Sequence, residues 1–253
     1  TRAGRVIAEL CARHLKRPLL ELGGKAPLVV LDDADVEQAV KAAAYGAFFH
    51  QGQICMSTER VLVHDDMADD FTARLAGHAS RFRTGDPRYP GNAIGPMISE
   101  QAAQRVKALI DDAVDKGARL VAGGKLRGAY LDATILDGLT PSMRIYYEES
   151  FGPVASVIRY SDIDEAVSIA NDTEYGLAAA VFGRDVTRAL DVAHRLETGI
   201  CHINAATIQD EPQVPFGGVK ASGYGRFGGR AGIDEFTELR WISLQGGREE
   251  YPI

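Results

Sequence analysis

The sequence predicts an α/β fold in which a mostly parallel sheet is flanked by helices. Short apolar runs rich in Val, Ile and Leu alternate with amphipathic stretches along the chain, as at 27–31, 60–64 and 154–160. Such runs are typical of strands that are buried on both faces of a sheet. The stretches between them are long enough to form helices, and strands joined by helical crossovers run parallel.

Length and composition are those of an ordinary globular protein with a substantial core. The chain has 253 residues, of which 45% are hydrophobic and 25% are charged. Its net charge of −7 argues against binding to nucleic acid or to anionic membranes, which requires a basic surface. No apolar run approaches the roughly 18 residues of a transmembrane helix, and the first residues lack the apolar core of a signal peptide.

Cysteine and histidine patterns narrow the possible chemistry. Three cysteines, Cys11, Cys55 and Cys201, are too widely spaced for a disulfide framework or a zinc motif. The six histidines show no spacing typical of metal ligands, so no metal site is expected. This cysteine usage favours a reducing, cytoplasmic compartment.

The first elements follow one another closely from the N-terminus. Arg5–Arg17 is predicted to form a helix, which a proline ends. Leu19–Leu22 is a short strand closed by two glycines, and Pro27–Leu31 is a buried strand. Asp35 is placed to cap the next helix, which runs to about Phe49.

The later elements repeat the alternation of strands and helices. The predicted strands share short apolar runs bounded by glycine or polar residues; they are 60–64, 120–121, 154–160, 177–182 and 199–204. The predicted helices lie at 67–83, 99–116, 162–170 and 185–196, and Ser99 is placed to cap the second of them. Near the end, Phe236–Leu244 alternates in hydropathy and predicts an exposed strand suited to pairing with another sheet edge.

Cys55 is a candidate nucleophile because small and polar residues surround it after the end of a predicted helix. A thiol reacts as its thiolate, so it must be accessible and must either have a lowered pKa or have a base beside it. The alternative is a buried structural cysteine, which is the commoner case for this residue type.

Glu21 is a candidate base because it lies at the carboxyl end of a predicted strand, beside Gly23 and Gly24. Ligands of parallel sheets collect at those ends, and paired glycines let a ligand or a backbone approach closely. The alternative is an exposed glutamate in a turn. Gly24-Lys25 does not form a phosphate-binding loop, because the upstream glycine spacing and the Ser or Thr after Lys are missing.

Two other segments have both a functional and an ordinary interpretation. Glu148, Glu149 and Phe151 precede the strand at 154–160, either as site residues or as solvated groups at a strand start. Residues 223–228 match the G-x-G-x-x-G pattern formally. A dinucleotide fingerprint must follow a strand, however, and the preceding segment is loop-like, so we do not assign a cofactor's phosphates to it.

Four motifs taken together are more specific than any one of them. They are ELGGK at 21–25, FFHQGQIC at 48–55, EESFGPV at 148–154 and PFGGVKASGYGR at 215–226. In this order they resemble the aldehyde dehydrogenase superfamily, and the resemblance runs from Thr1 to about Leu244. The stretch 201–242 resembles the branch that oxidises aromatic aldehydes such as salicylaldehyde, vanillin or benzaldehyde.

The resemblance implies a role for each matching residue. Cys55 would be the nucleophile, and Glu21 would activate the water that releases the product. The other implied roles are cofactor binding by Leu22, Gly23, Glu149 and Phe151, and contact with the aldehyde by Phe49, Ile54, Met56, Phe216 and the loop 205–214. The implied cofactor is NAD or NADP, with NAD favoured. The implied reaction oxidises an aldehyde to a carboxylic acid through a thiohemiacetal and a thioester on the cysteine.

The resemblance also divides the chain. It implies a remnant of the dinucleotide-binding domain at 1–24, a catalytic domain at 25–228, and a C-terminal helix with an oligomerisation strand at 229–253. We expect a longer parent protein that forms homodimers or homotetramers, because most of the family's cofactor domain precedes the ELGGK motif. A catalytically silent fragment is one alternative. An acylating enzyme that uses coenzyme A is another, although the retained Glu21 speaks against it.

Overall fold

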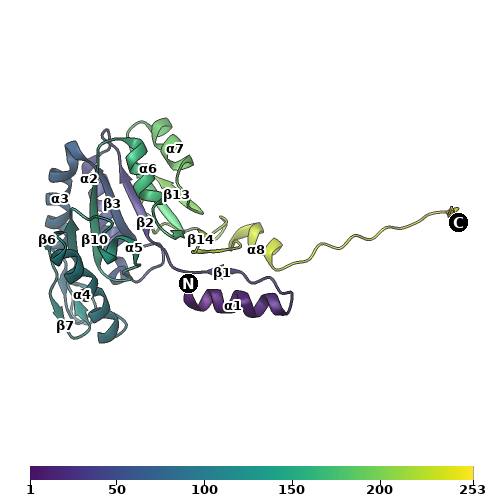
Figure 1. Cartoon of the computed structure of the whole chain (residues 1–253), viewed down its shortest axis with the longest axis horizontal. Coiled ribbons are helices and arrows are strands. Elements are labelled where there is room, and N and C mark those ends of the chain that lie inside the picture. The colour runs from purple at the N-terminus through teal and green to yellow at the C-terminus, as the bar shows by residue number, and fades with distance from the viewer. Residues whose placement is uncertain (253) are drawn as a thin grey trace.

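A computed structural model describes residues 1–252, and its centre is a seven-stranded sheet. The strands lie in the order β13 (Ile200–Ile203), β12 (Ala178–Phe182), β2 (Ala26–Val30), β3 (Thr58–His64), β10 (Val154–Tyr160), β9 (Thr134–Asp137) and β6 (Arg119–Ala122). Every neighbouring pair is parallel except β9 and β6, which run antiparallel. The prediction of a mostly parallel sheet is confirmed (Figure 1).

Helices cover both faces of the sheet because each face is apolar. One hydrophobic cluster joins α2 (Val36–Phe48) and α3 (Asp65–Ala79) to one face. A second cluster joins α4 (Glu100–Asp115), α6 (Ile163–Asn171) and α7 (Val186–His194) to the other face. Strand β2 is buried along its whole length, as expected for a central strand between two helical layers.

Side-chain caps set where four of these helices begin. Asp35 and Ser99 each accept a hydrogen bond from the backbone N–H three residues later. Asp162 and Asp185 cap α6 and α7 in the same way. The predicted starts of these helices are confirmed, because a cap depends on the local sequence alone.

Shorter elements surround this core. Two-stranded ribbons are formed by β1 (Leu20–Glu21) with β15 (Gly223–Tyr224), β11 (Tyr175–Gly176) with β14 (Val219–Lys220), β4 (Arg83–Thr84) with β5 (Asn92–Ile94), and β7 (Leu126–Arg127) with β8 (Tyr130–Leu131). The remaining helices are α1 (Arg2–Arg13), the 3-10 helix η1 (Phe49–Gly52), α5 (Arg144–Tyr147) and α8 (Gly229–Glu235). Most of these elements and the core strand β9 were not predicted, because very short runs carry too little pattern.

None of the helices within residues 1–252 is both long and apolar enough to cross a membrane.

Two predicted elements differ from the structure near the chain's ends. The first helix is Arg2–Arg13 rather than Arg5–Arg17, and it ends before Leu15, whose φ is +52°. Phe236–Leu244 is not a strand, since within the described residues neither a helix nor a strand follows α8. A strand needs a hydrogen-bonded neighbour, and this segment projects away from the body of the molecule (Figure 1).

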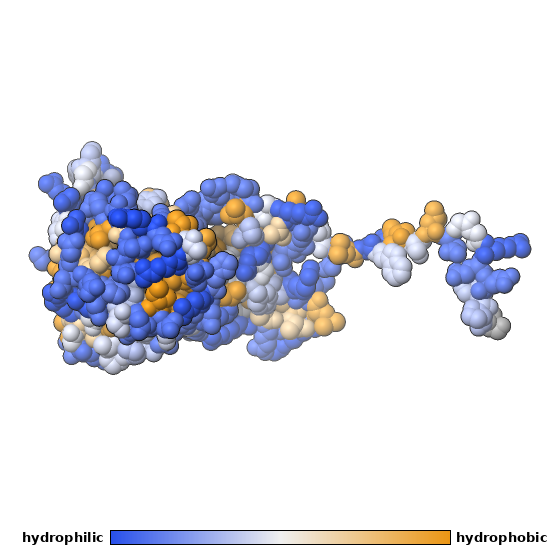
Figure 2. Space-filling view, turned by 90° about the horizontal axis from the view of Figure 1, so that it is seen from above, coloured by the Kyte–Doolittle hydropathy of each residue, from blue (hydrophilic) through white to orange (hydrophobic). Residues whose placement is uncertain are grey.

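Apolar side chains are exposed on both terminal segments. Val6, Ile7 and Leu10 of α1 are half exposed, and Trp241 and Leu244 of the C-terminal segment are almost fully exposed. Figure 2 shows apolar groups along the projecting segment, clear of the rest of the molecule. Contiguous apolar surface of this kind usually marks a contact with another domain or another chain.

Candidate active site

The candidate site residues gather at the amino ends of the parallel strands. Gly24 and Lys25 directly precede β2, Cys55 precedes β3, and Glu149 precedes β10. Glu21 lies at the carboxyl end of a short strand, as predicted, but that strand, β1, pairs with β15 outside the main sheet. The expectation that the site forms at the carboxyl ends of the parallel strands is therefore wrong. From β1 the chain passes through two glycines straight into the amino end of β2, so the site forms at that edge.

Gly23 and Gly24 form a turn that packs directly against both Cys55 and Glu149. A Cβ atom at Gly24 would lie 2.3 Å from the carbonyl oxygen of Cys55. A Cβ atom at Gly23 would lie 2.8 Å from Oε2 of Glu149. The N–H of Gly24 also donates a hydrogen bond to Oε1 of Glu149 at 2.9 Å. Only glycine allows approaches this close, so the turn lies packed between the candidate nucleophile and the candidate ribose-binding acid.

Ser222 holds the segment that carries Glu21 from the other side. Its buried hydroxyl donates a hydrogen bond to the carbonyl oxygen of Gly23 at 2.6 Å and accepts one from the N–H of Gly176 at 2.9 Å. The carbonyl oxygen of Ser222 accepts a hydrogen bond from the N–H of Leu22 at 3.1 Å. The PFGGVKASGYGR motif therefore fixes the backbone around Glu21.

Cys55 is half-buried and interacts electrostatically with two carboxylates. Burial raises the pKa of its thiol above the ordinary value, and the charges of Glu21 and Glu149 raise that pKa further. The backbone N–H groups of Cys55 and Met56 act in the opposite direction, because they stabilise the thiolate. The structure thus brings the predicted nucleophile and both predicted acids into one site.

Glu21 lies at the exposed side of this site. Partial burial raises the pKa of its carboxyl above the ordinary value, and the negative charge of Asp210 adds to this effect. Arg226 lowers the same pKa. A carboxylate with a raised pKa is a stronger base, which suits proton abstraction near neutral pH. Asp210 belongs to the loop 205–214, and sequence analysis did not single it out.

Cys55 packs against an apolar cluster, and a cavity adjoins that cluster. The cluster consists of residues at the amino ends of the strands and in the loop that follows β13; they are Ala26, Ile54, Cys55, Met56, Leu177, Ala178, Ile200, Ile208 and Phe216. A cavity of about 310 Å³ adjoins this cluster and shares Ile200 and Phe216 with it. His202, Gln209 and Asp210 add polar groups to the cavity wall. The cavity is thus the candidate pocket for a substrate.

The four predicted pocket residues occupy different places. Ile54 and Phe216 are half-buried in the apolar cluster, whereas Met56 is buried within it at 6% exposure. Phe49 lies apart from the cluster and half exposed, where its ring contacts Tyr45 with 5.1 Å between the ring centroids. Of the four, Phe216 is the residue that lines the cavity.

The predicted cofactor residues offer groups that fit a nicotinamide ribose and ring. Glu149 is half-buried, and burial raises the pKa of its carboxyl. Gly23, which has no side chain, lets that carboxylate lie directly against its backbone, and the ring of Phe151 is partly exposed. Leu22 instead packs against α1, where a Cβ at Gly4 would lie 2.5 Å from its side chain. Among the residues that the structure describes, no group of three or more His, Cys, Asp or Glu could hold a metal ion.

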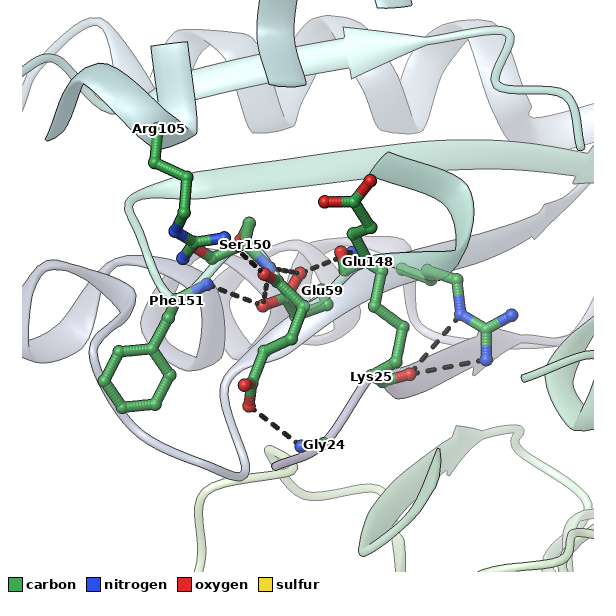
Figure 3. A network of polar contacts seen from close by, with 9 residues as sticks. Gly24, Lys25, Glu59, Arg105, Glu148, Ser150 and Phe151 are labelled. Carbon is green, nitrogen blue, oxygen red and sulfur yellow. Dashed lines mark hydrogen bonds and ion pairs between the residues drawn. The ribbon is translucent and has the colours of Figure 1, made fainter. Parts of the chain in front are cut away.

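Three site residues were missed by sequence analysis. Lys25 and Glu59 form a buried ion pair, and Arg105 of α4 donates a hydrogen bond to the backbone carbonyl of Glu149 at 3.0 Å (Figure 3). The sequence contains two features from which the pair could have been predicted. Lys25 ends the ELGGK motif, and Glu59-Arg60 places two charges directly before the apolar run 61–63. Charges at such positions are rarely buried unless they are paired.

Comparison with known proteins identifies relatives of the whole chain. A family model described as "Aldehyde dehydrogenase family" matches residues 1–242. A vanillin dehydrogenase of Pseudomonas fluorescens is 59% identical over 253 residues, and a salicylaldehyde dehydrogenase of Pseudomonas putida is 54% identical over 253 residues. Each match covers 100% of this chain and 52% of the relative.

A solved structure extends the comparison to the fold. The crystal structure of a salicylaldehyde dehydrogenase from Pseudomonas putida G7 complexed with salicylaldehyde superposes with a TM-score of 0.97 at 53% identity. The superposition covers 100% of this chain and 52% of that chain. The chain therefore spans about half the length of the curated relatives it matches. The family model, the fold and the four motifs agree, and this chain belongs to the aldehyde dehydrogenase family.

Proposed function

We propose that this chain is the catalytic half of an enzyme that oxidises an aromatic aldehyde to its carboxylic acid with NAD or NADP, with NAD favoured. The observation that carries the proposal is that Cys55 interacts with Glu21 and Glu149 and belongs to an apolar cluster that adjoins a cavity. The names of the relatives, vanillin dehydrogenase and salicylaldehyde dehydrogenase, support an aromatic substrate.

The first step belongs to Cys55. Its thiolate attacks the aldehyde carbon, a C–S bond forms, and the carbonyl oxygen becomes the negatively charged oxygen of a thiohemiacetal. The backbone N–H of Cys55, which already stabilises negative charge at the sulfur, is a donor that this chain offers to that oxygen. Phe216 and its apolar neighbours would hold the ring of the aldehyde against the nucleophile.

Glu149, Gly23 and Phe151 are the residues that would hold the nicotinamide half of the cofactor. The Glu149 carboxylate would accept hydrogen bonds from the ribose hydroxyls, and the exposed ring of Phe151 would contact the nicotinamide. When bound, the oxidised nicotinamide would supply the hydride acceptor, so that loss of hydride from the thiohemiacetal carbon would leave a thioester on Cys55.

The last step belongs to Glu21. Its carboxylate takes a proton from a water molecule, and the resulting hydroxide attacks the thioester carbon. The C–S bond then breaks, which releases the carboxylic acid and returns the Cys55 thiolate. The raised pKa of Glu21 supports this role, because it strengthens the carboxylate as a base. Water rather than coenzyme A is the expected acceptor for the same reason.

We propose that the parent protein is cytoplasmic and forms homodimers or homotetramers through the segment 236–244. The exposed apolar side chains of that segment support a contact with a second chain. The same proposal divides the chain into a dinucleotide-domain remnant at 1–24, a catalytic domain at 25–228 and a C-terminal part at 229–253. The exposed apolar face of α1 supports contact with the remainder of a cofactor domain.

A panel of aldehydes tests the proposed function. The longer protein that carries this chain is supplied with aromatic and aliphatic aldehydes, each with NAD or NADP, and the reduced cofactor is measured by absorbance. We expect the highest kcat/KM with an aromatic aldehyde and NAD, and no oxidation in a Cys55→Ala variant. If the intact protein oxidises none of the aldehydes, the alternative of a catalytically silent protein is favoured instead.

The role of Glu21 is tested in the same assay with a Glu21→Gln variant. Steady-state turnover should fall by about 10² to 10⁴, the usual contribution of a general base. One equivalent of reduced cofactor per active site should still appear in a burst, because thioester formation does not need this carboxylate. Glu37→Gln, on the exposed surface of α2, is the matched control. Unimpaired turnover in Glu21→Gln would remove Glu21 from the mechanism.

A further inference from the structure

The lysine of the ELGGK motif has no role in the proposed reaction, yet it is one of the most deeply buried charges in the chain. Nζ of Lys25 donates a hydrogen bond to Oε2 of Glu59 at 2.5 Å, and the two side chains are 0% and 5% exposed. Burying two charges is costly, even when they are paired. Such a pair adds little stability compared with apolar residues.

The remaining hydrogen bonds of this pair go to the segment that carries Glu149 (Figure 3). Lys25 donates to the carbonyl oxygen of Glu148 at 2.8 Å. Oε1 of Glu59 accepts from the N–H of Ser150 at 2.8 Å and from the N–H of Phe151 at 3.0 Å. The peptide groups on both sides of Glu149 are therefore held by one buried ion pair.

Two further observations concern the backbone of residues 148–151, which is strained at one residue and fixed by hydrogen bonds from two sides. Phe151 has a φ of +50°, a left-handed conformation that is strained for an aromatic residue. Arg105 donates to the carbonyl oxygens of Glu149 and Ser150 at 3.0 and 2.6 Å, on the side facing α4. Glu59 stabilises the strained backbone directly, because its carboxylate accepts from the N–H of Phe151 itself. As a result the Glu149 carboxylate is aimed at the N–H of Gly24.

We propose that Lys25 and Glu59 are positioning residues for the nicotinamide cofactor. They act through the backbone of residues 148–151 and fix the carboxylate of Glu149 and the ring of Phe151 where the ribose and the nicotinamide would bind. The inference rests on the proposed function, since it assigns the pair to the cofactor side of that site. It predicts that damage to the pair weakens cofactor binding while the chemistry at Cys55 continues.

A Glu59→Gln variant of the longer protein provides the first test. Hydrogen bonds to a charged group contribute about 1.5–3 kcal/mol, so the KM for the cofactor should rise by roughly tenfold or more. The KM for the aldehyde should stay unchanged. Hydrolysis of an activated aryl ester, which acylates Cys55 without any cofactor, should also stay unchanged. An unaltered KM for the cofactor contradicts the proposal.

A double variant separates positioning from simple stabilisation. Lys25→Met with Glu59→Gln removes both buried charges, and such replacements are often neutral or stabilising. We expect the melting temperature of the double variant to recover relative to Glu59→Gln, while the KM for the cofactor stays raised. Recovery of both quantities together would mean that the pair is only structural. Asp137→Asn, another buried carboxylate with ion pairs, is the control that should lose stability without a change in this KM.

Failure of this inference differs from failure of the proposed function. Normal oxidation with an unaltered cofactor KM in both Glu59 variants contradicts the inference alone. A wild-type protein that neither oxidises aldehydes nor hydrolyses the ester contradicts the proposed function. Hydrogen exchange on the chain itself adds an independent measure, since Glu59→Gln should speed exchange at the amides of Ser150 and Phe151.

Discussion

Cys55 lies in surroundings that disfavour its own thiolate. The sulfur is half-buried, and Glu21 and Glu149 place negative charge beside it, so the pKa of the thiol is raised. A free cysteine has a pKa of about 8.5, and only the thiolate reacts rapidly with oxidants and alkylating agents. At neutral pH the resting thiol is therefore mostly protonated, which slows its reaction with oxidants and alkylating agents.

The pH dependence of alkylation tests this electrostatic picture on the chain itself. The rate of iodoacetamide reaction at Cys55 should rise with pH, with a midpoint above the ordinary value of about 8.5. Glu21→Gln removes one negative charge, so the pKa of Cys55 should fall and the midpoint should move to lower pH. Peptide mapping follows Cys201 in the same digest, and that thiol should stay unlabelled because burial raises its pKa to about 11. A midpoint that does not move in the variant would contradict the assignment.

At the scale of elements, the connection between α2 and β3 decides where Cys55 lies. Three consecutive residues of η1, His50, Gln51 and Gly52, have φ values of +51°, +57° and +66°. This left-handed turn reverses the chain at the end of α2 and delivers Cys55 to the amino end of β3. The turn packs closely on the segment before β10, where a Cβ at Gly52 would lie 2.1 Å from the carbonyl oxygen of Gly152.

Gly52→Ala should therefore disturb both stability and the site. A left-handed conformation costs an alanine roughly 1–2 kcal/mol, and the clash with Gly152 adds to that cost. We expect a lower free energy of unfolding in urea and a changed rate of Cys55 alkylation. Gly77→Ala is the matched control, because Gly77 lies within α3 with no atom within 4 Å of a new Cβ. That substitution should raise stability by about 0.5–1 kcal/mol, so equal effects of the two changes would contradict the interpretation.

At the scale of the whole molecule, both terminal segments expose apolar side chains that other parts of this chain do not cover. Helix α1 presents Val6, Ile7 and Leu10 to solvent, and the segment after α8 presents Trp241 and Leu244. The central sheet ends at β13 on one side, so the chain also offers a strand edge. Exposed edges and alternating apolar segments are the features through which strands pair between chains. As the proposed subunit contact, 236–244 is expected to become a strand once a partner supplies its hydrogen bonds.

Truncation tests this interpretation. Removal of residues 237–253 from the longer protein should convert the oligomer to a monomer, as measured by light scattering. The free energy of unfolding of the isolated chain should change by less than about 0.5 kcal/mol, because residues 237–252 are exposed. Removal of 246–253 alone keeps the apolar segment and should leave the oligomer intact. An unchanged mass after the longer truncation would place the subunit contact elsewhere.

The elements that were predicted correctly depend on local pattern. Asp35 and Ser99 cap their helices within three residues of themselves, and β2 and β10 are runs of apolar residues that need no distant information. The motifs that resemble the aldehyde dehydrogenase family are local as well. Strand β9 and the ribbon strands other than β1 were missed, because their short runs acquire strand structure only from their neighbours.

The sequence by itself determined the α/β class, the starts of four capped helices and the choice of candidate nucleophile and base. Only the tertiary structure decided that the site lies at the amino ends of the strands, that Phe49 stands apart from the pocket, and that Glu59 holds Ser150 across 91 positions of sequence. The physical reason is the sequence separation over which each kind of interaction acts. Caps, apolar periodicity and motifs are encoded within a few residues, whereas strand order, buried ion pairs and cavities arise from contacts between distant segments that only the folded chain brings together.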